Sequence, residues 1–95
     1  MDILFLPSAG RDLRWFREYY TGVFPDGHDR ASRQLRAILR ILRANPYIGR
    51  ETEAGGRVRE LIVPRTPFIL LYRVDKRESR IEILRVIDGR SGWKE

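Results

Sequence analysis

The chain has 95 residues, the usual size of one domain, and 42% of them are hydrophobic. It has no cysteine, so disulfides and thiolate metal ligands are excluded and packing alone must hold the fold. The net charge is +6, and 17 of the 19 basic residues are arginine, which binds carboxylates and phosphates bidentately. We therefore expect a single domain (residues 1–95) that binds an anionic macromolecule and has neither a cofactor nor a small-molecule substrate. Codon bias in a GC-rich genome is the alternative explanation of the arginine excess.

Targeting and membrane-spanning signals are not found in the sequence. There is no run of 18 apolar residues, and residues 1–10 have neither the basic leader nor the long apolar stretch of a signal peptide. We expect a soluble protein that stays in the cytoplasm and has no membrane partner.

The N-terminal half predicts one strand and two helices. Residues 2–6 are apolar and are followed by a proline, which ends a strand. Residues 8–24 begin with a candidate N-cap serine and carry apolar residues at spacings of three and four, as one face of a helix does. Residues 25–29 have the composition of a turn, and Asp29 is expected to cap a second helix that ends at Asn45. Two helices joined by so short a turn should be antiparallel.

The C-terminal half predicts a polar connection over residues 47–56 and then three strands, at 58–63, 68–74 and 80–87. Alternation in the last strand predicts two faces, with Ile81, Ile83 and Ile87 on one and Glu82, Leu84 and Val86 on the other. The expected fold is α+β: an N-terminal strand and an antiparallel helical hairpin packed on one face of a small, mainly antiparallel sheet.

The middle strand indicates that the second face of this sheet needs a cover. Residues 68–72 are apolar on both sides of the pleat, a pattern typical of strands buried on both faces. One layer of helices covers only one face, so we expect a protein partner on the other. A dimer contact or the C-terminal tail is the alternative cover.

Three segments carry a resemblance to a known family: NPYIGRE (45–51), VRELIVPRTPFILLYRV (58–74) and RIEILRVIDGRSGW (80–93). With their order and spacing, the chain resembles the RelE/ParE superfamily of toxin-antitoxin toxins over nearly its whole length. The resemblance implies a bacterial cytoplasmic toxin that arrests growth and is neutralised by a cognate antitoxin, whose flexible segment wraps the toxin.

The superfamily has two branches, and the residues favour the one whose members poison DNA gyrase, named after ParE. RelE-like members resemble ribosome-dependent mRNA endonucleases, in which basic residues on neighbouring strands hold the scissile phosphate. At the positions of these basic residues this chain has Glu60, Ile62 and Ile69. The position before Gly89, which is often histidine in relatives, is Asp88, and only Arg90 matches a basic position of the nucleases. A carboxylate near the phosphate would repel it, so the ribosome is the alternative target. A non-toxic protein-interaction or nucleic-acid-binding module is a second alternative.

Candidate antitoxin-binding residues are the arginines that interrupt the strand patterns and the apolar residues of the middle strand: Arg59, Phe68, Leu70, Tyr72, Arg73 and Arg85. Salt bridges within the sheet are the alternative role of these arginines.

Candidate target-binding residues lie toward the C-terminus: Asp88, Arg90 and Trp93. The alternative role of Trp93 is to cover the hydrophobic core. We expect no catalytic and no metal-binding residue, since the single histidine, His28, lies in a polar loop. The helix arginines Arg33, Arg36, Arg40 and Arg43 fit a nucleic-acid stripe, but a solvated helix face is the simpler explanation.

Overall fold

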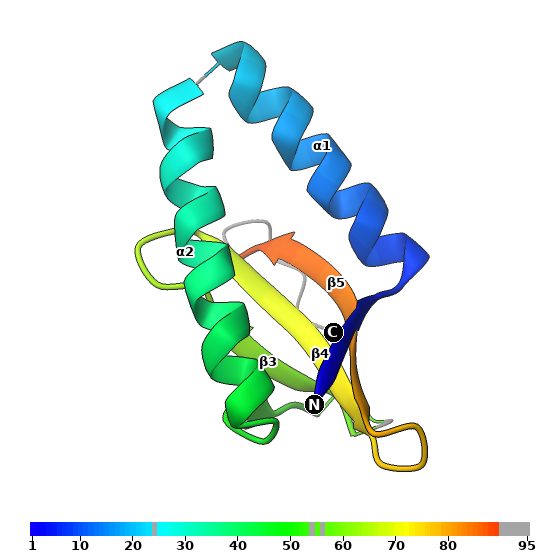
Figure 1. Ribbon diagram of the computed structural model, residues 1–95. Coiled ribbons are helices and arrows are strands. Elements are labelled where there is room, and N and C mark those ends of the chain that lie inside the picture. The colour runs from blue at the N-terminus through cyan, green and yellow to red at the C-terminus, as the bar shows by residue number, and fades with distance from the viewer. Residues whose placement is uncertain (24, 54, 56, 90–95) are drawn as a thin grey trace.

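The computed structural model describes residues 1–23, 25–53, 55 and 57–89. One strand precedes two helices, and four strands follow them. Figure 1 shows the two helices, α1 and α2, beside the strands β3, β4 and β5. The elements are β1 (Asp2–Phe5), α1 (Pro7–Val23), α2 (Pro25–Ala44), β2 (Arg50–Glu51), β3 (Arg59–Ile62), β4 (Phe68–Asp75) and β5 (Arg80–Asp88). Neither described helix is long and apolar enough to span a membrane.

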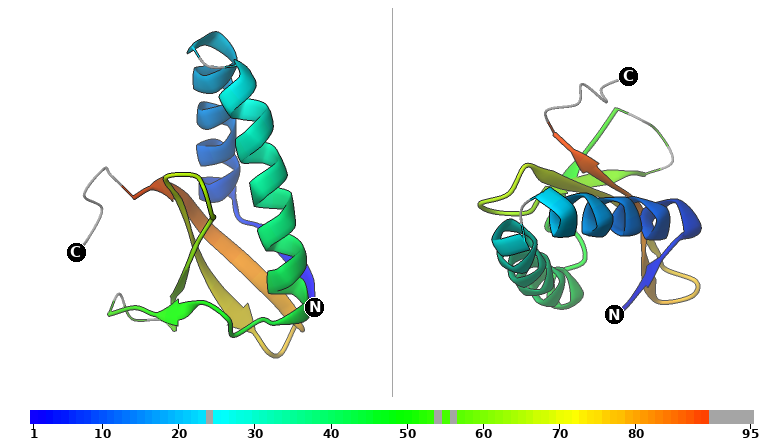
Figure 2. Two further views of the ribbon diagram at one scale, coloured as in Figure 1. Left: turned by 90° about the vertical axis from the view of Figure 1, so that its left-hand side faces the viewer. Right: turned by 90° about the horizontal axis from the view of Figure 1, so that it is seen from above.

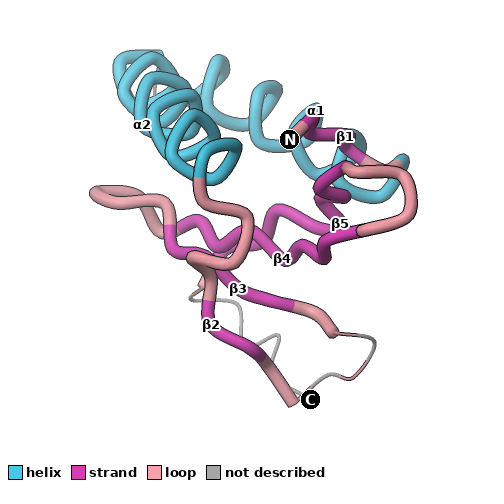
Figure 3. The backbone as a smooth tube through the Cα atoms, turned by 60° about the horizontal axis from the view of Figure 1, so that its bottom comes forward, coloured by secondary structure: helices cyan, strands magenta, loops and turns pink. Residues whose placement is uncertain are grey.

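The strands form one five-stranded sheet in the order β1-β5-β4-β3-β2 (Figure 3). β1 runs parallel to β5, while the other pairs are antiparallel. The first strand therefore lies beside the last one, and both helices lie on the same face of the sheet (Figure 2). This arrangement confirms the predicted α+β class with a helical hairpin on a mainly antiparallel sheet.

The core lies between the helices and one face of β4. The ring of Phe68 contacts the rings of Phe16 and Tyr20 on α1, with centroid distances of 4.4 and 5.8 Å. Alternation along β4 places Leu70 and Tyr72 on the same side, where both are fully buried. Other buried residues of this core are Ala9, Ile38, Leu42, Val63, Ile81, Ile83 and Val86.

A bulge in β5 changes the faces that its residues occupy. Tyr72 pairs with Ile83, but the next residue back along β4, Leu71, pairs with Arg85, so the pairing skips one residue of β5. As a result Val86 joins the helix-facing core, while Ile87 pairs with Ile69 on the other face. The predicted faces of Val86 and Ile87 were wrong, because strict alternation holds only in a ladder without an inserted residue.

Two further boundaries differ from the prediction. Residues 25–29, predicted as a turn that Asp29 ends, form the start of α2 instead. Proline is favoured at the first helical position, and Asp26 adds negative charge to the first turn, near the positive end of the helix dipole. The predicted polar connection contains the two-residue strand β2, which is too short for an alternating pattern to reveal.

Asp12 of α1 fixes the helix layer to the sheet. β1 pairs with β5 only over residues 80–83, so the next part of that edge needs another partner. The Asp12 carboxylate accepts a hydrogen bond from the Val86 amide at 2.9 Å and two from the Arg85 guanidinium at 2.7 and 3.1 Å. These bonds raise the pKa of Arg85, and they hold α1 in one position over the sheet.

Candidate macromolecule-binding surfaces

The face of the sheet opposite the helices, here called the open face, has an apolar strip at its centre. Ile62, Ile69 and Ile87 pair across β3, β4 and β5, and Leu71 follows on β4. Ile62 is 64% exposed, Ile69 and Leu71 are half-buried, and Ile87 is only 7% exposed. Neither of the two described helices lies over this strip, which fits the predicted need for a partner on the second face.

Arginine–glutamate pairs border the strip. The buried carboxylate of Glu82 accepts hydrogen bonds from Arg73 Nε at 2.7 Å and from Arg80 Nη2 at 2.9 Å. These bonds, led by that from Arg73, lower the pKa of Glu82, so its carboxylate stays ionised. The side chains of Arg73 and Arg80 remain 46% and 38% exposed. A partner's carboxylate therefore has access to both guanidinium groups. Arg50 makes a similar pair with Glu60.

Each of the three arginines predicted to bind an antitoxin has an acidic partner inside the chain. Arg73 contacts Glu82, and Arg85 contacts Asp12. Arg59 contacts Glu51 at 3.1 Å, donates to the Gly49 carbonyl at 2.7 Å, and lies 5.2 Å from the centre of the Tyr47 ring. Salt bridges within the sheet, the alternative considered from the sequence, thus describe Arg59 and Arg73, whereas Arg85 pairs with Asp12 on α1, outside the sheet.

The three apolar residues predicted to bind an antitoxin lie in the core. Phe68 is 7% exposed, and Leu70 and Tyr72 are fully buried beneath the helices. Their burial contradicts the predicted accessibility of these three residues, and the neighbouring Ile69 and Leu71 are residues of β4 that face away from the helices. Every residue from 68 to 72 is apolar, so the sequence did not reveal which set faces the helices.

The predicted target-binding residues lie at the end of β5 and beyond it. Asp88 pairs with Phe68 in the sheet register, whereas Arg90 and Trp93 lie outside the described residues. The Gly89 amide donates to the Pro67 carbonyl at 2.7 Å. A Cβ atom on Gly89 would lie 2.9 Å from Ile69 Cδ1, so the described chain ends beside the apolar strip.

Comparison with known proteins identifies the family. The family model described as "ParE toxin of type II toxin-antitoxin system, parDE" matches residues 3–93. The chain belongs to the ParE toxin family. A solved structure titled "Chromosomal ParDE TA system from P. aeruginosa" is 28% identical with a TM-score of 0.76, over 93% of this chain and 95% of that chain. The comparison with curated proteins gives no match. The ParE-like resemblance seen in the sequence is thereby confirmed.

This ParE-family chain also carries a second surface that sequence reasoning did not find, a groove with a volume of about 790 Å³. It lies between the two helices and the β3–β4 connection, and its walls include Tyr19, Tyr20, Arg30, Arg33 and Arg65. We call it the arginine groove. Its residues come from three separate segments, so no spacing within one segment signals it; only Arg33 had been noted, as part of the α2 stripe.

Proposed function

We propose that this ParE-family chain is a toxin that inhibits DNA gyrase by binding and is held inactive by a cognate antitoxin. Its family membership over residues 3–93 carries the proposal. The similar solved structure is titled as a ParDE toxin-antitoxin system, and this supports an antitoxin as the partner of the present chain.

The open face suits a segment of such an antitoxin. Ile62, Ile69 and Leu71 offer apolar contacts, while Arg73 and Arg80 keep part of their guanidinium groups exposed beside them. An extended segment with apolar and acidic residues would fill the strip and add carboxylates to the border. The net charge of +6 would draw an acidic antitoxin toward the toxin. Arg85 likewise keeps 51% of its side chain exposed beside Asp12, whereas the Arg59 side chain is 20% exposed and is left out of this contact.

The open face also supports binding over RNA cleavage. Glu60, Ile62 and Ile69 occupy the positions where RelE-like nucleases have basic residues, and β3 and β4 bring all three onto the open face. Because Glu60 is already paired with Arg50 and the other two are apolar, none of these three positions supplies a cation to hold a scissile phosphate. We therefore assign gyrase as the target, with Asp88, Arg90 and Trp93 as its proposed contacts.

Expression in bacteria tests the proposal. The chain produced alone should arrest growth with filamentation and DNA-damage signalling, and a small acidic-tailed antitoxin encoded beside it should restore growth. Rapid cleavage of transcripts within reading frames would instead support the ribosome as target. Normal growth on production of soluble, folded chain would support a non-toxic interaction module.

A further inference from the structure

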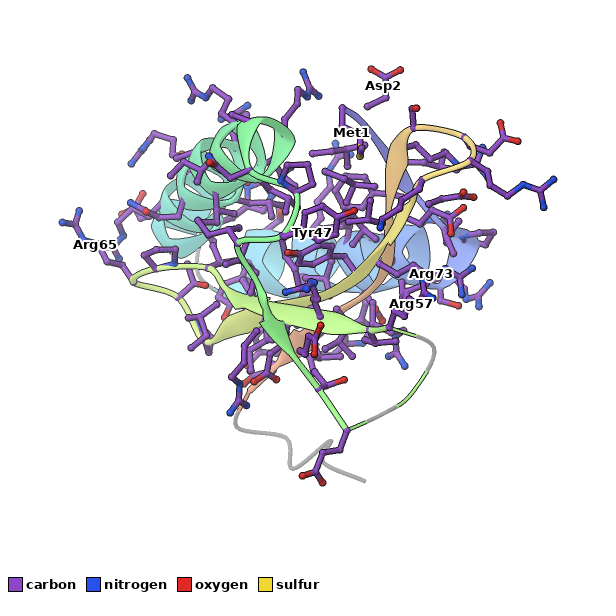
Figure 4. The ribbon with its side chains drawn as sticks, turned by 90° about the horizontal axis from the view of Figure 1, so that it is seen from below. Met1, Asp2, Tyr47, Arg57, Arg65 and Arg73 are labelled. Carbon is purple, nitrogen blue, oxygen red and sulfur yellow. The ribbon has the colours of Figure 1, made fainter. Side chains whose placement is uncertain are left out.

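The arginine groove brings together cations that are far apart in the sequence. Arg30 and Arg33 come from the first half of α2, and Arg65 comes from the β3–β4 connection. Figure 1 shows this connection beside α2, and Figure 4 shows Arg65 projecting outward from it. Three guanidinium groups thus border one groove.

These guanidinium groups are available for an outside anion. Within the described residues, Arg30, Arg33 and Arg65 make no ion pair, in contrast to the arginines of the open face. The groove has no carboxylate in its lining. Asp26 and Asp29 border Arg30 and Arg33 in an adjacent hollow without forming ion pairs with them. A ligand would therefore meet exposed cations that are not engaged in an ion pair with any described residue.

Arg65 is presented by a turn that is fixed in a costly conformation. Its φ is +63°, in the left-handed region that non-glycine residues adopt at a cost of about 1–2 kcal/mol. The Thr66 hydroxyl holds the turn by donating to the Val63 carbonyl at 2.9 Å and accepting from the Phe68 amide at 3.0 Å. Arg57 and Ser79 have similar positive φ values, so what the turn contributes here is a fixed position for Arg65.

An exposed aromatic pair lies beside these cations. Tyr19 lines the groove and stacks on Trp15, with ring centroids 5.2 Å apart and planes 7° apart. The two residues are 47% and 57% exposed, so this stack buries little of either residue. Flat, exposed rings next to arginines are typical of proteins that bind single-stranded nucleic acid, in which bases stack on the rings and phosphates contact the cations.

We propose that the arginine groove binds a single strand of DNA. Arg30, Arg33 and Arg65 contact successive phosphates, and an unpaired base stacks on Tyr19. The exposed arginines Arg36, Arg40 and Arg43 continue the basic surface along α2. The inference rests on the proposed function in one respect: a gyrase inhibitor acts where DNA is bound and cut, which favours DNA over RNA. An acidic peptide would satisfy the cations but leave the aromatic stack without a matching ring.

Fluorescence anisotropy of a labelled 20-nucleotide single-stranded DNA with the purified full chain tests this proposal. Binding should weaken steeply between about 50 and 200 mM salt, as phosphate contacts require. The double substitution Arg33→Gln/Arg65→Gln should weaken binding about 10-fold or more, and Tyr19→Ala should weaken it about 5-fold or more.

The matched control Arg57→Gln/Arg77→Gln removes the same charge outside the groove and should change the affinity for DNA less than about 3-fold. Figure 4 shows Arg57 on the opposite side of the view from Arg65. Thermal melting verifies that each variant folds.

Several results would overturn the inference. Absence of DNA binding by the folded wild-type chain would do so, as would equal losses in the groove and control variants, which would indicate only general charge attraction. Groove-dependent binding of RNA of the same sequence in preference to DNA, or of polyglutamate but not DNA, would assign the groove to another ligand. Gyrase inhibition without DNA binding would refute this inference alone, whereas DNA binding without gyrase inhibition would refute only the proposed function.

Discussion

At the scale of single residues, the contact between Gly49 and Tyr72 ties the helix–sheet connection to the core. The Gly49 amide donates to the Tyr72 hydroxyl at 2.8 Å inside the protein. Burial raises the pKa of Tyr72, so the phenol stays neutral. A Cβ atom on Gly49 would come within 2.6 Å of the Tyr72 ring and 2.8 Å of the Glu60 carbonyl oxygen. Only glycine fits this approach without movement of the backbone.

Gly49→Ala should therefore lower the free energy of unfolding by about 2 kcal/mol or more, since the added methyl group overpacks a site closed by backbone. Gly10→Ala is the matched control, because Gly10 lies in α1 with nothing within 4 Å of the added atom. It should raise stability by up to about 1 kcal/mol, the helix propensity difference between the two residues. Urea titration measures both, and equal effects would contradict the described packing.

Glu82 should make the stability of the fold depend on pH, with stability falling as the pH falls. Hydrogen bonds from Arg73 and Arg80 lower its pKa in the folded chain, so this contribution to stability is present above the unfolded pKa, about 4.3, and is lost as the pH falls through the folded pKa. Glu82→Gln should cost about 1–2 kcal/mol at pH 7, and the difference from wild type should shrink below about pH 4. Denaturant titrations over pH 2.5–7 measure it. Exposed Glu78→Gln is the control, and a difference independent of pH would contradict the assignment.

At the scale of elements, one helix residue replaces a missing strand partner. β1 ends before it can pair with the second half of β5, and Asp12 of α1 supplies the acceptor for the Val86 amide and for Arg85. The placement of α1, and with it one wall of the arginine groove, depends on this contact.

Asp12→Ala should destabilise the fold by about 2–3 kcal/mol, because it leaves a partly buried amide and a guanidinium without their acceptor. Hydrogen exchange should become faster at the Val86 amide and along α1. Asp29→Ala is the control, since the Asp29 side chain is 73% exposed and a change there should stay within about 0.5 kcal/mol. Unchanged exchange at Val86 would show that Asp12 does not hold this edge.

At the scale of the whole molecule, both helices lie on one face of the sheet, and the open face is the surface proposed to bind the antitoxin. Ile62→Glu places a charge on the apolar strip at a residue that is 64% exposed, so folding should be preserved while antitoxin affinity falls about 10-fold or more. Ile41→Glu introduces the same change on α2 at a residue that is 44% exposed and should leave affinity within about 2-fold. Titration calorimetry of each variant with the antitoxin decides between them. Equal affinities would place the antitoxin elsewhere.

The pattern of apolar residues in the sequence predicted both helices, four of the five strands and the fold class, and missed only the two-residue strand β2. It failed where the pattern was degenerate or interrupted. All residues from 68 to 72 are apolar, so the pattern did not show that Phe68, Leu70 and Tyr72, named as candidate antitoxin contacts, are buried under the helices. The bulge near Leu84 exchanged the faces of Val86 and Ile87. The partners of the predicted arginines and the arginine groove arise from contacts between distant segments, which local spacing does not encode.

The proposed action on gyrase can be measured with the purified chain, purified gyrase and plasmid DNA. We expect supercoiling to be inhibited and cleaved DNA to accumulate, and the cognate antitoxin should reverse both effects. A chain truncated after Gly89, which keeps the contact with Pro67, should lose the inhibition while still binding antitoxin. Supercoiling and cleavage that stay unchanged at a large molar excess of folded toxin, together with a block of cell-free translation, would contradict the account.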